Sequence, residues 1–308
     1  MEWLSFRLVL TTVDQIYLDG VENCENAIKM VPASIQPFKY LSELYKNKAM
    51  NIAYEKDKDN RVEMIDLYKL TLDILDKGLE NNSNNIELLS KKINPLYSLA
   101  KLYSNEYSKA RGYFLQAIRI ANEIYQTNQE SSTILNKVAL AKAKYANFLR
   151  DNGEEKNYTE SEKYYLEAIE LFTKAHESSK TITSILNIGG VNFEYALLKR
   201  KQKDLNKAIE LLKIHLDILE KNTPKRLVMF EYFKSYFRNM SILLPLMLEV
   251  NEDPKEYVKR SIKIANTICR FVGLNHEQKY YIQQIVDFYR EIKLASIRDF
   301  QSCKGFVK

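Results

Sequence analysis

Apolar residues recur at steps of three and four along almost the whole chain, and this spacing predicts α-helices. The clearest example is the stretch of residues 143–172, in which one apolar stripe precedes Gly153 and a second follows it. Small residues alternate with large ones in both stripes, so two antiparallel helices can approach closely. We therefore expect a helical hairpin here, with stripes formed by Tyr145, Ala146 and Leu149 and by Ser161, Tyr165 and Ala168.

The same periodicity predicts helices over the remainder of the chain. Short polar links separate them, such as residues 81–85 and 251–254, whose Asn and Asp side chains can satisfy the free backbone groups at helix ends. The expected helices span residues 2–18, 20–31, 35–55, 60–80, 85–105, 107–127, 131–151, 159–177, 181–202, 204–221, 225–250, 254–272 and 276–299.

An internal repeat appears in the second helix of each expected hairpin, as three residues separated by four and then three positions. The pattern occurs six times, and successive occurrences begin about 44 to 51 residues apart. Such units bury their apolar faces by stacking on one another. The six sets are Gly20, Cys24, Ala27; Met64, Tyr68, Thr71; Ala110, Phe114, Ala117; Ser161, Tyr165, Ala168; Ala208, Leu212, His215; and Val258, Ile262, Ala265.

These hairpins resemble the tetratricopeptide repeat family. The first helices reproduce its large, small, aromatic spacing at Leu99, Ala100 and Tyr103, and the second helices carry its small residues at the close contacts. The standard unit has about 34 residues, so the resemblance is to an extended form. It implies an all-α, right-handed superhelical solenoid of about six to seven antiparallel hairpins. HEAT and armadillo units, about 40 to 47 residues long, are the alternative, but the repeated proline, aspartate and arginine of HEAT units are missing.

Composition favours one continuous helical body. The chain has 308 residues, 45% of them hydrophobic, with 8 Gly and 6 Pro, too few for the many turns of an all-β fold. A repeat array grows by stacking, so its length does not require a division into domains. We expect a single repeat domain over residues 1–300 and a frayed tail over residues 301–308, where the periodicity ends.

Charge and cysteine content narrow the choice of partner and compartment. The net charge of +6 is mild for a nucleic-acid binder of this size. The sharpest basic clusters are residues 199–203 and 225–226, and the first lies where a helix C-terminus favours cations. Apolar residues 240–250 are too few to span a membrane.

The three cysteines, Cys24, Cys269 and Cys303, are widely spaced, which suggests neither a disulfide framework nor a metal site. Cys303 is the expected free thiol. We therefore expect a cytoplasmic protein.

The sequence offers no assembled catalytic site. Glycine-rich phosphate loops, the nucleophile elbow and the HExxH zinc motif are all absent. The three histidines, His176, His215 and His276, lie far apart, and His215 falls on the packing stripe of the fifth repeat. We therefore predict a protein without catalytic activity, cofactor or metal.

The resemblance implies that the first helices of the hairpins line a ligand groove. Carried over by register, the groove positions offer amides, cations and rings, which suit a peptide with acidic or aromatic side chains. Asn147 fits one position of the family's chaperone-binding carboxylate clamp, but Tyr97 and Glu194 replace a lysine and an asparagine, so chaperone tails are not predicted. The groove residues are Asn94, Tyr97 and Lys101, then Asn147 and Arg150, then Phe193 and Arg200.

The resemblance therefore predicts a protein- or peptide-binding scaffold, which could be one subunit of a larger assembly. A peptide-sensing regulator similar to bacterial quorum-sensing repeat proteins is an alternative, although no DNA-binding helix-turn-helix stands out before Pro32. An RNA-binding helical repeat is a further alternative, in which some of the 21 tyrosines would stack on bases beside basic residues. A basic position repeated in every unit is missing, which counts against it.

Overall fold

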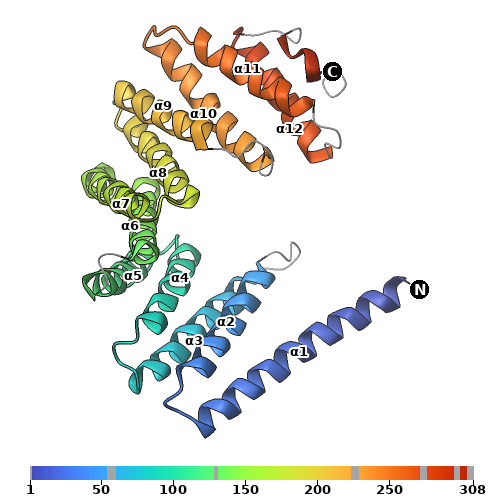
Figure 1. Cartoon of the computed structure of the whole chain (residues 1–308), viewed down its shortest axis with the longest axis vertical. Helices are drawn as coiled ribbons and strands as arrows, with labels where there is room; N and C mark the ends of the chain where they lie inside the picture. The colour runs from blue at the N-terminus through green and yellow to red at the C-terminus, as the bar shows by residue number, and fades with distance from the viewer. Residues whose placement is uncertain are drawn as a thin grey trace. The chain divides into compact units, whose positions relative to one another are not determined.

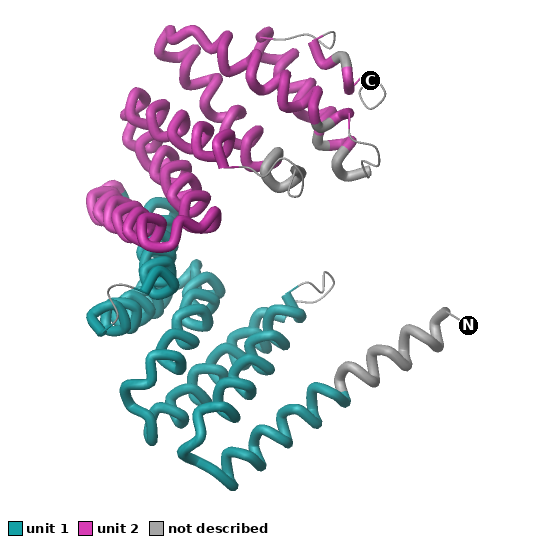
Figure 2. Tube along the Cα trace, viewed as in Figure 1, with its two compact units in different colours: residues 1–154 teal, residues 155–308 magenta. Residues whose placement is uncertain are grey.

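The computed structural model describes residues 2–53, 60–127, 131–222, 229–270, 276–294 and 299–303. The regular secondary structure within these ranges is helical and comprises twelve α-helices with short 3-10 turns (Figure 1). The all-α architecture expected from the sequence is thus confirmed. Two compact units divide the chain, residues 1–154 as unit 1 and residues 155–308 as unit 2 (Figure 2). The expectation of a single repeat domain over residues 1–300 stays a prediction.

Unit 1 is a series of six α-helices, each of which packs against the next along the chain. Alternate helices also touch, since α2 contacts α4 and α4 contacts α6. These even-numbered helices are the first helices of the predicted hairpins, so they form the face on which the resemblance placed the groove. The helices are α1 (Glu2–Met30), α2 (Ile35–Ile52), α3 (Arg61–Glu80), α4 (Ile86–Leu102), α5 (Tyr107–Thr127) and α6 (Ser132–Asn152).

Helix α1 corrects the prediction of two helices divided at Gly20. It is continuous over 29 residues, with Gly20 inside it. A Cβ atom built on this glycine would lie 3.2 Å from Leu44 Cδ1, so the missing side chain allows α2 to approach closely. Glycine inside a helix costs only about 1 kcal/mol relative to alanine. Packing of Tyr17, Val21 and other α1 side chains on the α2–α4 core offsets that cost.

Unit 2 continues the alternation of packed helices. Each helix from α7 to α10 contacts the next one along the chain, and α10 also contacts α12. The last helix ends at Glu291, earlier than the predicted residue 299, and Lys293 adopts a positive φ of 55° just after it. The elements are η1 (Glu155–Asn157), α7 (Tyr158–Ser179), α8 (Ile182–Lys201), α9 (Leu205–Asn222), α10 (Met229–Glu249), α11 (Lys255–Cys269), α12 (His276–Glu291) and η3 (Gln301–Cys303).

The repeated small and large residues form the core of both units. Most of the pattern residues are buried, including every alanine of the third to sixth sets. The pattern residues that are only half-buried belong to the first, second and sixth sets, which match the pattern by size and polarity alone. They are Gly20, Cys24, Ala27, Met64 and Ile262. The fully buried members of the pattern, together with the matching residues on the first helices, are Leu99, Ala100, Ala110, Ala117, Tyr145, Ala146, Leu149, Ser161, Tyr165, Ala168, Ala208 and Leu212.

Lys199 occupies a stripe position where the repeat pattern favours an aromatic residue or leucine. Its Nζ atom donates to Glu162 Oε2 at 2.8 Å and lies 5.4 Å from the centre of the Tyr195 ring. The Tyr195 hydroxyl donates to the same carboxylate. Burial acts to raise the pKa of Glu162, but these two donors hold that pKa below its ordinary value. An ion pair thus replaces the missing apolar contact between α7 and α8.

The C-terminal segment corrects the expectation for the cysteines. Cys269 and Cys303 form a disulfide with their Cα atoms 5.1 Å apart, and Cys303 is fully buried. Their separation of 34 residues concealed the pairing, which arises because residues 299–303 pack on α11. Asn266 holds this segment by donating to Asp299 O at 2.9 Å and accepting from the Ser302 backbone N–H at 2.8 Å. Of the tail expected to fray, residues 301–303 therefore form η3, and residues 304–308 lie outside the described residues.

A search for membrane spans found none: within the described part of the chain, every helix is too short or too polar to cross a bilayer.

Candidate functional surfaces

The predicted groove residues fall in both units and differ widely in exposure. Asn94 and Lys101 are exposed on α4, whereas Tyr97, between them on the same helix, is buried with 6% of its surface accessible. Asn147 is half-buried on α6. Arg200 is exposed in the last turn of α8. The exposed groove cations of the prediction are therefore Lys101 in unit 1 and Arg200 in unit 2.

Arg150 and Phe193 do not present their side chains as the groove prediction requires. Arg150 is only 6% exposed, and its guanidinium donates twice to the Asp151 carboxylate at 2.8 Å. Phe193 is 4% exposed, and the Arg238 guanidinium covers its ring at 4.6 Å from the ring centre. Both positions were chosen by helical register, which gives the direction of a side chain but not what a neighbouring helix places over it.

The even-numbered helices of unit 1 carry a cluster of lysines that we call the lysine face, formed by Lys91 and Lys101 on α4 and Lys137 and Lys144 on α6. Lys137 Nζ lies 3.0 Å from Ser90 Oγ, and Lys144 Nζ lies 6.0 Å from the centre of the Tyr97 ring. These contacts join α4 to α6 and place the two pairs of lysines along the seam between the helices.

Burial and repulsion between lysines both act on the lysine face. Burial and the charge of Lys91 lower the pKa of Lys137, and burial and the charge of Lys101 lower the pKa of Lys144. Glu43 of α2 partly neutralises one edge, where its Oε1 atom lies 2.7 Å from Lys91 Nζ. Lys101, Lys137 and Lys144 are exposed, so a partner can reach them.

Tyr97 forms the apolar support of the lysine face. Its ring packs against Phe114 with the ring centres 5.8 Å apart, and its buried hydroxyl has no hydrogen-bond partner among the described residues. Burial raises the pKa of this phenol far above its usual value, so the group stays neutral. The exposed Leu140 lies on α6 between Lys137 and Lys144, three residues from one and four from the other. Cations, amides and an apolar side chain therefore share this surface.

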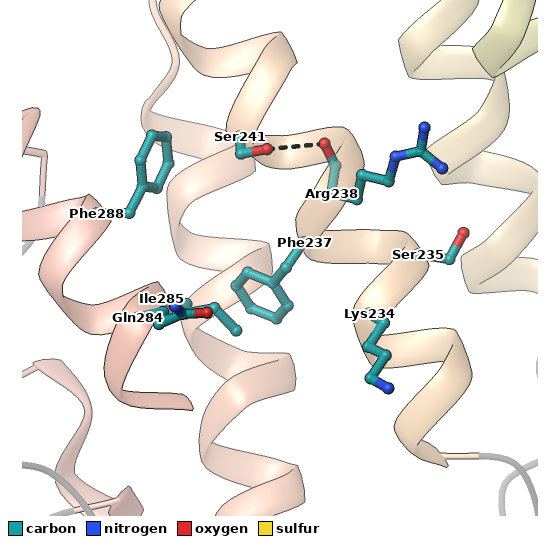
Figure 3. Close-up of a pocket in the computed structure, with 8 residues that line it drawn as sticks. All are labelled: Lys234, Ser235, Phe237, Arg238, Ser241, Gln284, Ile285 and Phe288. Carbon is teal, nitrogen blue, oxygen red and sulfur yellow. Dashed lines mark hydrogen bonds between the residues drawn. The ribbon is translucent and has the colours of Figure 1, made fainter. Parts of the chain in front are cut away.

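A pocket of about 530 Å³ opens between α10 and α12 in unit 2 (Figure 3). One wall follows the i, i+3, i+4, i+7 stripe of α10 and the other follows one face of α12. Apolar side chains meet between the helices, while cationic and hydroxyl groups lie along α10. The lining residues are Lys234, Ser235, Phe237, Arg238, Ser241, Gln284, Ile285 and Phe288.

The sequence did not predict this pocket, because the apolar second half of α10 has the pattern of a buried core helix. A usable signal was the placement of Lys234 and Arg238 one turn apart beside Phe237. Arg238 is 62% exposed and lies 3.8 Å from Glu194 Oε1, at the long end of an ion pair. The Arg238 guanidinium also covers the ring of Phe193. Phe193, a predicted groove residue, therefore packs against a residue that lines the pocket.

His215 forms a buried polar contact beneath this edge. Its Nδ1 atom accepts from Asn239 Nδ2 at 2.9 Å, and the same amide donates to Leu212 O at 2.9 Å, which fixes the orientation of the amide. Burial and the nearby Arg238 lower the pKa of His215 to about 4. The imidazole is therefore neutral and acts as a structural acceptor.

The other candidate groups for chemistry lie apart from one another. His176 lies in the last turn of α7, where its Nδ1 atom is 3.1 Å from Ser184 Oγ of α8. The side chain of His276 lies outside the described residues. Within the described ranges, no three His, Cys, Asp or Glu side chains are grouped so as to hold a metal ion. The described surfaces therefore offer contacts for binding, in the form of cations, amides and apolar walls.

Comparison with known proteins shows a similar fold but assigns no family. No family model matches the chain, and no curated protein matches it. The crystal structure of BtubC (BKLC) from P. vanneervenii is similar over 85% of this chain and 93% of that chain, with 15% sequence identity and a TM-score of 0.57. At this identity the likeness shows the fold alone, an all-α helical array.

Two further solved structures align at lower TM-scores. A circular tandem repeat protein with novel repeat topology covers 97% of this chain and 76% of its own, at 13% identity and a TM-score of 0.40. YrrB, a TPR protein with an unusual peptide-binding site, matches 64% of this chain and 93% of its own, at 18% identity and a TM-score of 0.23. At these scores neither structure adds to the assignment of the fold.

Proposed function

We propose that the chain is a non-catalytic scaffold that binds an acidic segment of a protein or peptide on the lysine face of unit 1. The observation that carries this proposal is the placement of two repelling lysine pairs, Lys91 with Lys137 and Lys101 with Lys144, on the adjacent helices α4 and α6. All of these lysines except Lys91 are exposed. Carboxylates placed among these cations would relieve the repulsion and form charge-assisted hydrogen bonds.

The dimensions of the lysine face suit an extended segment. Lys91 and Lys101 are ten residues apart on α4, which corresponds to about 15 Å along the helix axis. An extended chain covers that distance in about five residues, enough to present two or three acidic side chains on one side. The exposed amide of Asn94 is available to the backbone of such a segment, and Leu140 is available to an apolar side chain.

The burial of the aromatic rings favours a protein partner over RNA. Binding of single-stranded nucleic acid without sequence preference relies on exposed rings on which bases stack. Tyr97, Tyr103, Tyr145, Tyr165 and Tyr195 are all at most 6% exposed and pack within the helical array. These five rings, including Tyr97 of the lysine face, thus offer no open face on which a base could stack. A peptide-sensing regulator would bind its peptide on the same surface, so the lysine face is compatible with that alternative as well.

Reversal of two charges tests the proposal. We expect Lys101→Glu with Lys144→Glu to weaken binding of a fluorescein-labelled acidic peptide, acetyl-GEEDLEEG-amide, by at least about tenfold, because both ammonium groups would become repulsive carboxylates. Fluorescence anisotropy measures the affinity, and circular dichroism checks that the fold persists. Arg150→Glu is unsuitable here, because its effect on a buried, paired side chain would be on stability.

The control for this test is Lys69→Glu with Lys77→Glu, which makes the same charge change at exposed positions of α3. The proposal fails if the control weakens binding as much as the test variant does, or if the test variant binds normally. A labelled RNA oligonucleotide provides a second arm. If RNA binds more tightly than the peptide and loses affinity steeply with salt, the surface serves nucleic acid instead.

A further inference from the structure

We propose that the pocket between α10 and α12 is a second binding site, which takes a bulky apolar side chain of a protein segment together with a carboxylate beside it. This site lies wholly within unit 2, on residues other than those of the lysine face. It therefore goes beyond the function proposed above and stands or fails separately from it.

The inner part of the pocket is a rigid apolar wall. Phe237 and Ile285 are 4% and 6% exposed and lie next to each other where the two helices face one another (Figure 3). The Phe237 ring packs edge-on against Tyr236 and Tyr289, at centre distances of 5.6 and 6.4 Å, so its position is held from behind. Phe288 completes the wall one turn along α12. An apolar side chain placed against these residues loses contact with water on the side that faces them.

The volume of the pocket limits the size of its occupant. Ligand sites usually measure about 300 to 1,000 Å³, and this pocket of 530 Å³ lies in the lower half of that range. It accommodates one large side chain, such as phenylalanine or leucine, with part of the adjoining backbone. Gln284 and Ser241 lie at the rim, where the Gln284 amide can bind that backbone. The Ser241 hydroxyl donates to Arg238 O and can still accept a hydrogen bond from the backbone.

The charged rim determines which neighbour the apolar side chain needs. The ionisable residues that line the pocket are Lys234 and Arg238. Both are cations, and they lie one turn apart from each other on α10. Arg238 is 62% exposed, and its pairing with Glu194 at 3.8 Å leaves donors for a bidentate carboxylate contact. A segment with an acidic residue next to its apolar residue therefore matches both the wall and the rim.

Base stacking does not explain this arrangement as well. A nucleobase would need the open face of a ring, but Phe237 is 4% exposed and its ring is held between the helices. The hydroxyl of Ser241 already donates to Arg238 O at 2.9 Å. An apolar side chain, which needs no hydrogen bonds from the inner wall, fits better.

Calorimetry with three short peptides and the full chain tests the site. We expect acetyl-GSEFLEG-amide to bind in the micromolar range, with a Kd of about 10 to 100 µM. The charge-reversed peptide acetyl-GSKFLKG-amide and the apolar-deleted peptide acetyl-GSESSEG-amide should each bind at least tenfold more weakly. Equal binding of all three peptides would overturn the proposal.

Two substitutions locate the binding. Ser241→Phe places a ring at the rim from an exposed position and should block entry, and Arg238→Glu should weaken binding at least tenfold through repulsion. Lys259→Glu is the matched control, because it makes the same type of charge reversal at an exposed position of α11 outside the pocket, and should leave the affinity unchanged.

A second comparison separates this proposal from the lysine face. The Lys101→Glu, Lys144→Glu variant should bind acetyl-GSEFLEG-amide with the affinity of the unmodified chain. If that variant loses binding while Ser241→Phe retains it, the peptide occupies the lysine face and the pocket is not its site. If Ser241→Phe alone abolishes binding, the pocket proposal holds whether or not the lysine face binds a partner. Circular dichroism of each variant confirms that the helices are intact.

Discussion

Ala168→Arg is expected to destabilise unit 2 severely, by on the order of 4 kcal/mol, because it forces a long cation into a closed contact. Ala168 is fully buried in α7, one turn after Tyr165, whose ring packs against Tyr195 of α8 at a centre distance of 5.6 Å. An arginine here must either displace these rings or lie unpaired among apolar groups. Both outcomes cost far more than a typical surface substitution.

Thermal unfolding followed by circular dichroism measures this effect. For a unit of about 150 residues, a loss of this size lowers the melting temperature by about 10 °C. Leu166→Arg is the control on the same helix, because Leu166 is 51% exposed and an arginine there extends into water. An unchanged melting temperature in Ala168→Arg would mean that the stripe of Ser161, Tyr165 and Ala168 does not face the neighbouring helix.

His215 is expected to make the stability of unit 2 depend on pH in the mildly acidic range. Its pKa is about 4 in the folded chain and 6.5 for an unperturbed side chain, because burial and Arg238 disfavour the imidazolium. Between these values the unfolded chain binds a proton that the folded chain does not. The contribution of this residue is thus fully present above about pH 6.5 and is lost as the pH falls toward 4.

The size of this effect follows from the difference between the two pKa values, and amounts to about 3 kcal/mol at its limit. Chemical denaturation of the unmodified chain and of His215→Gln at pH 7 and pH 4.5 measures it. The glutamine amide oxygen can still accept from Asn239, so the variant should lose less stability than the unmodified chain on acidification. His176→Gln, in the last turn of α7, controls for the substitution itself.

Acidification also protonates carboxylates, so the informative quantity is the difference between the two proteins at each pH. If the unmodified chain and His215→Gln lose equal stability between pH 7 and pH 4.5, the histidine is not held neutral in the folded state. That result would also remove the reason for assigning Nδ1 as the acceptor of the Asn239 amide.

The positions of most helices followed from local information. The step of three and four residues is a property of one helix. Short polar links supply caps, as at the start of α4, where the Asn85 side chain accepts from Leu88 N–H at 3.0 Å. Gly20 misled the prediction because a glycine can end a helix or allow a second helix to approach, and only the presence of Leu44 distinguishes the two cases.

The exposure of the predicted groove residues followed less fully from the sequence than the helices did. Register correctly placed Lys101 and Asn94 on an exposed face of α4, because the direction of a side chain from a helix is a local property. It could not show that Arg150 is buried, or that Arg238 of α10 covers Phe193. The covering of Phe193 depends on a residue of another helix.

By itself, the sequence determined an all-α array in which small residues mark the close contacts, since periodicity and residue size act within a single helix and its hairpin. The tertiary structure decided which cations remain exposed, how Cys269 meets Cys303 across 34 residues, and where α10 and α12 leave a pocket. Those features arise from contacts between segments distant in the chain, and no local pattern encodes the distance between two such segments.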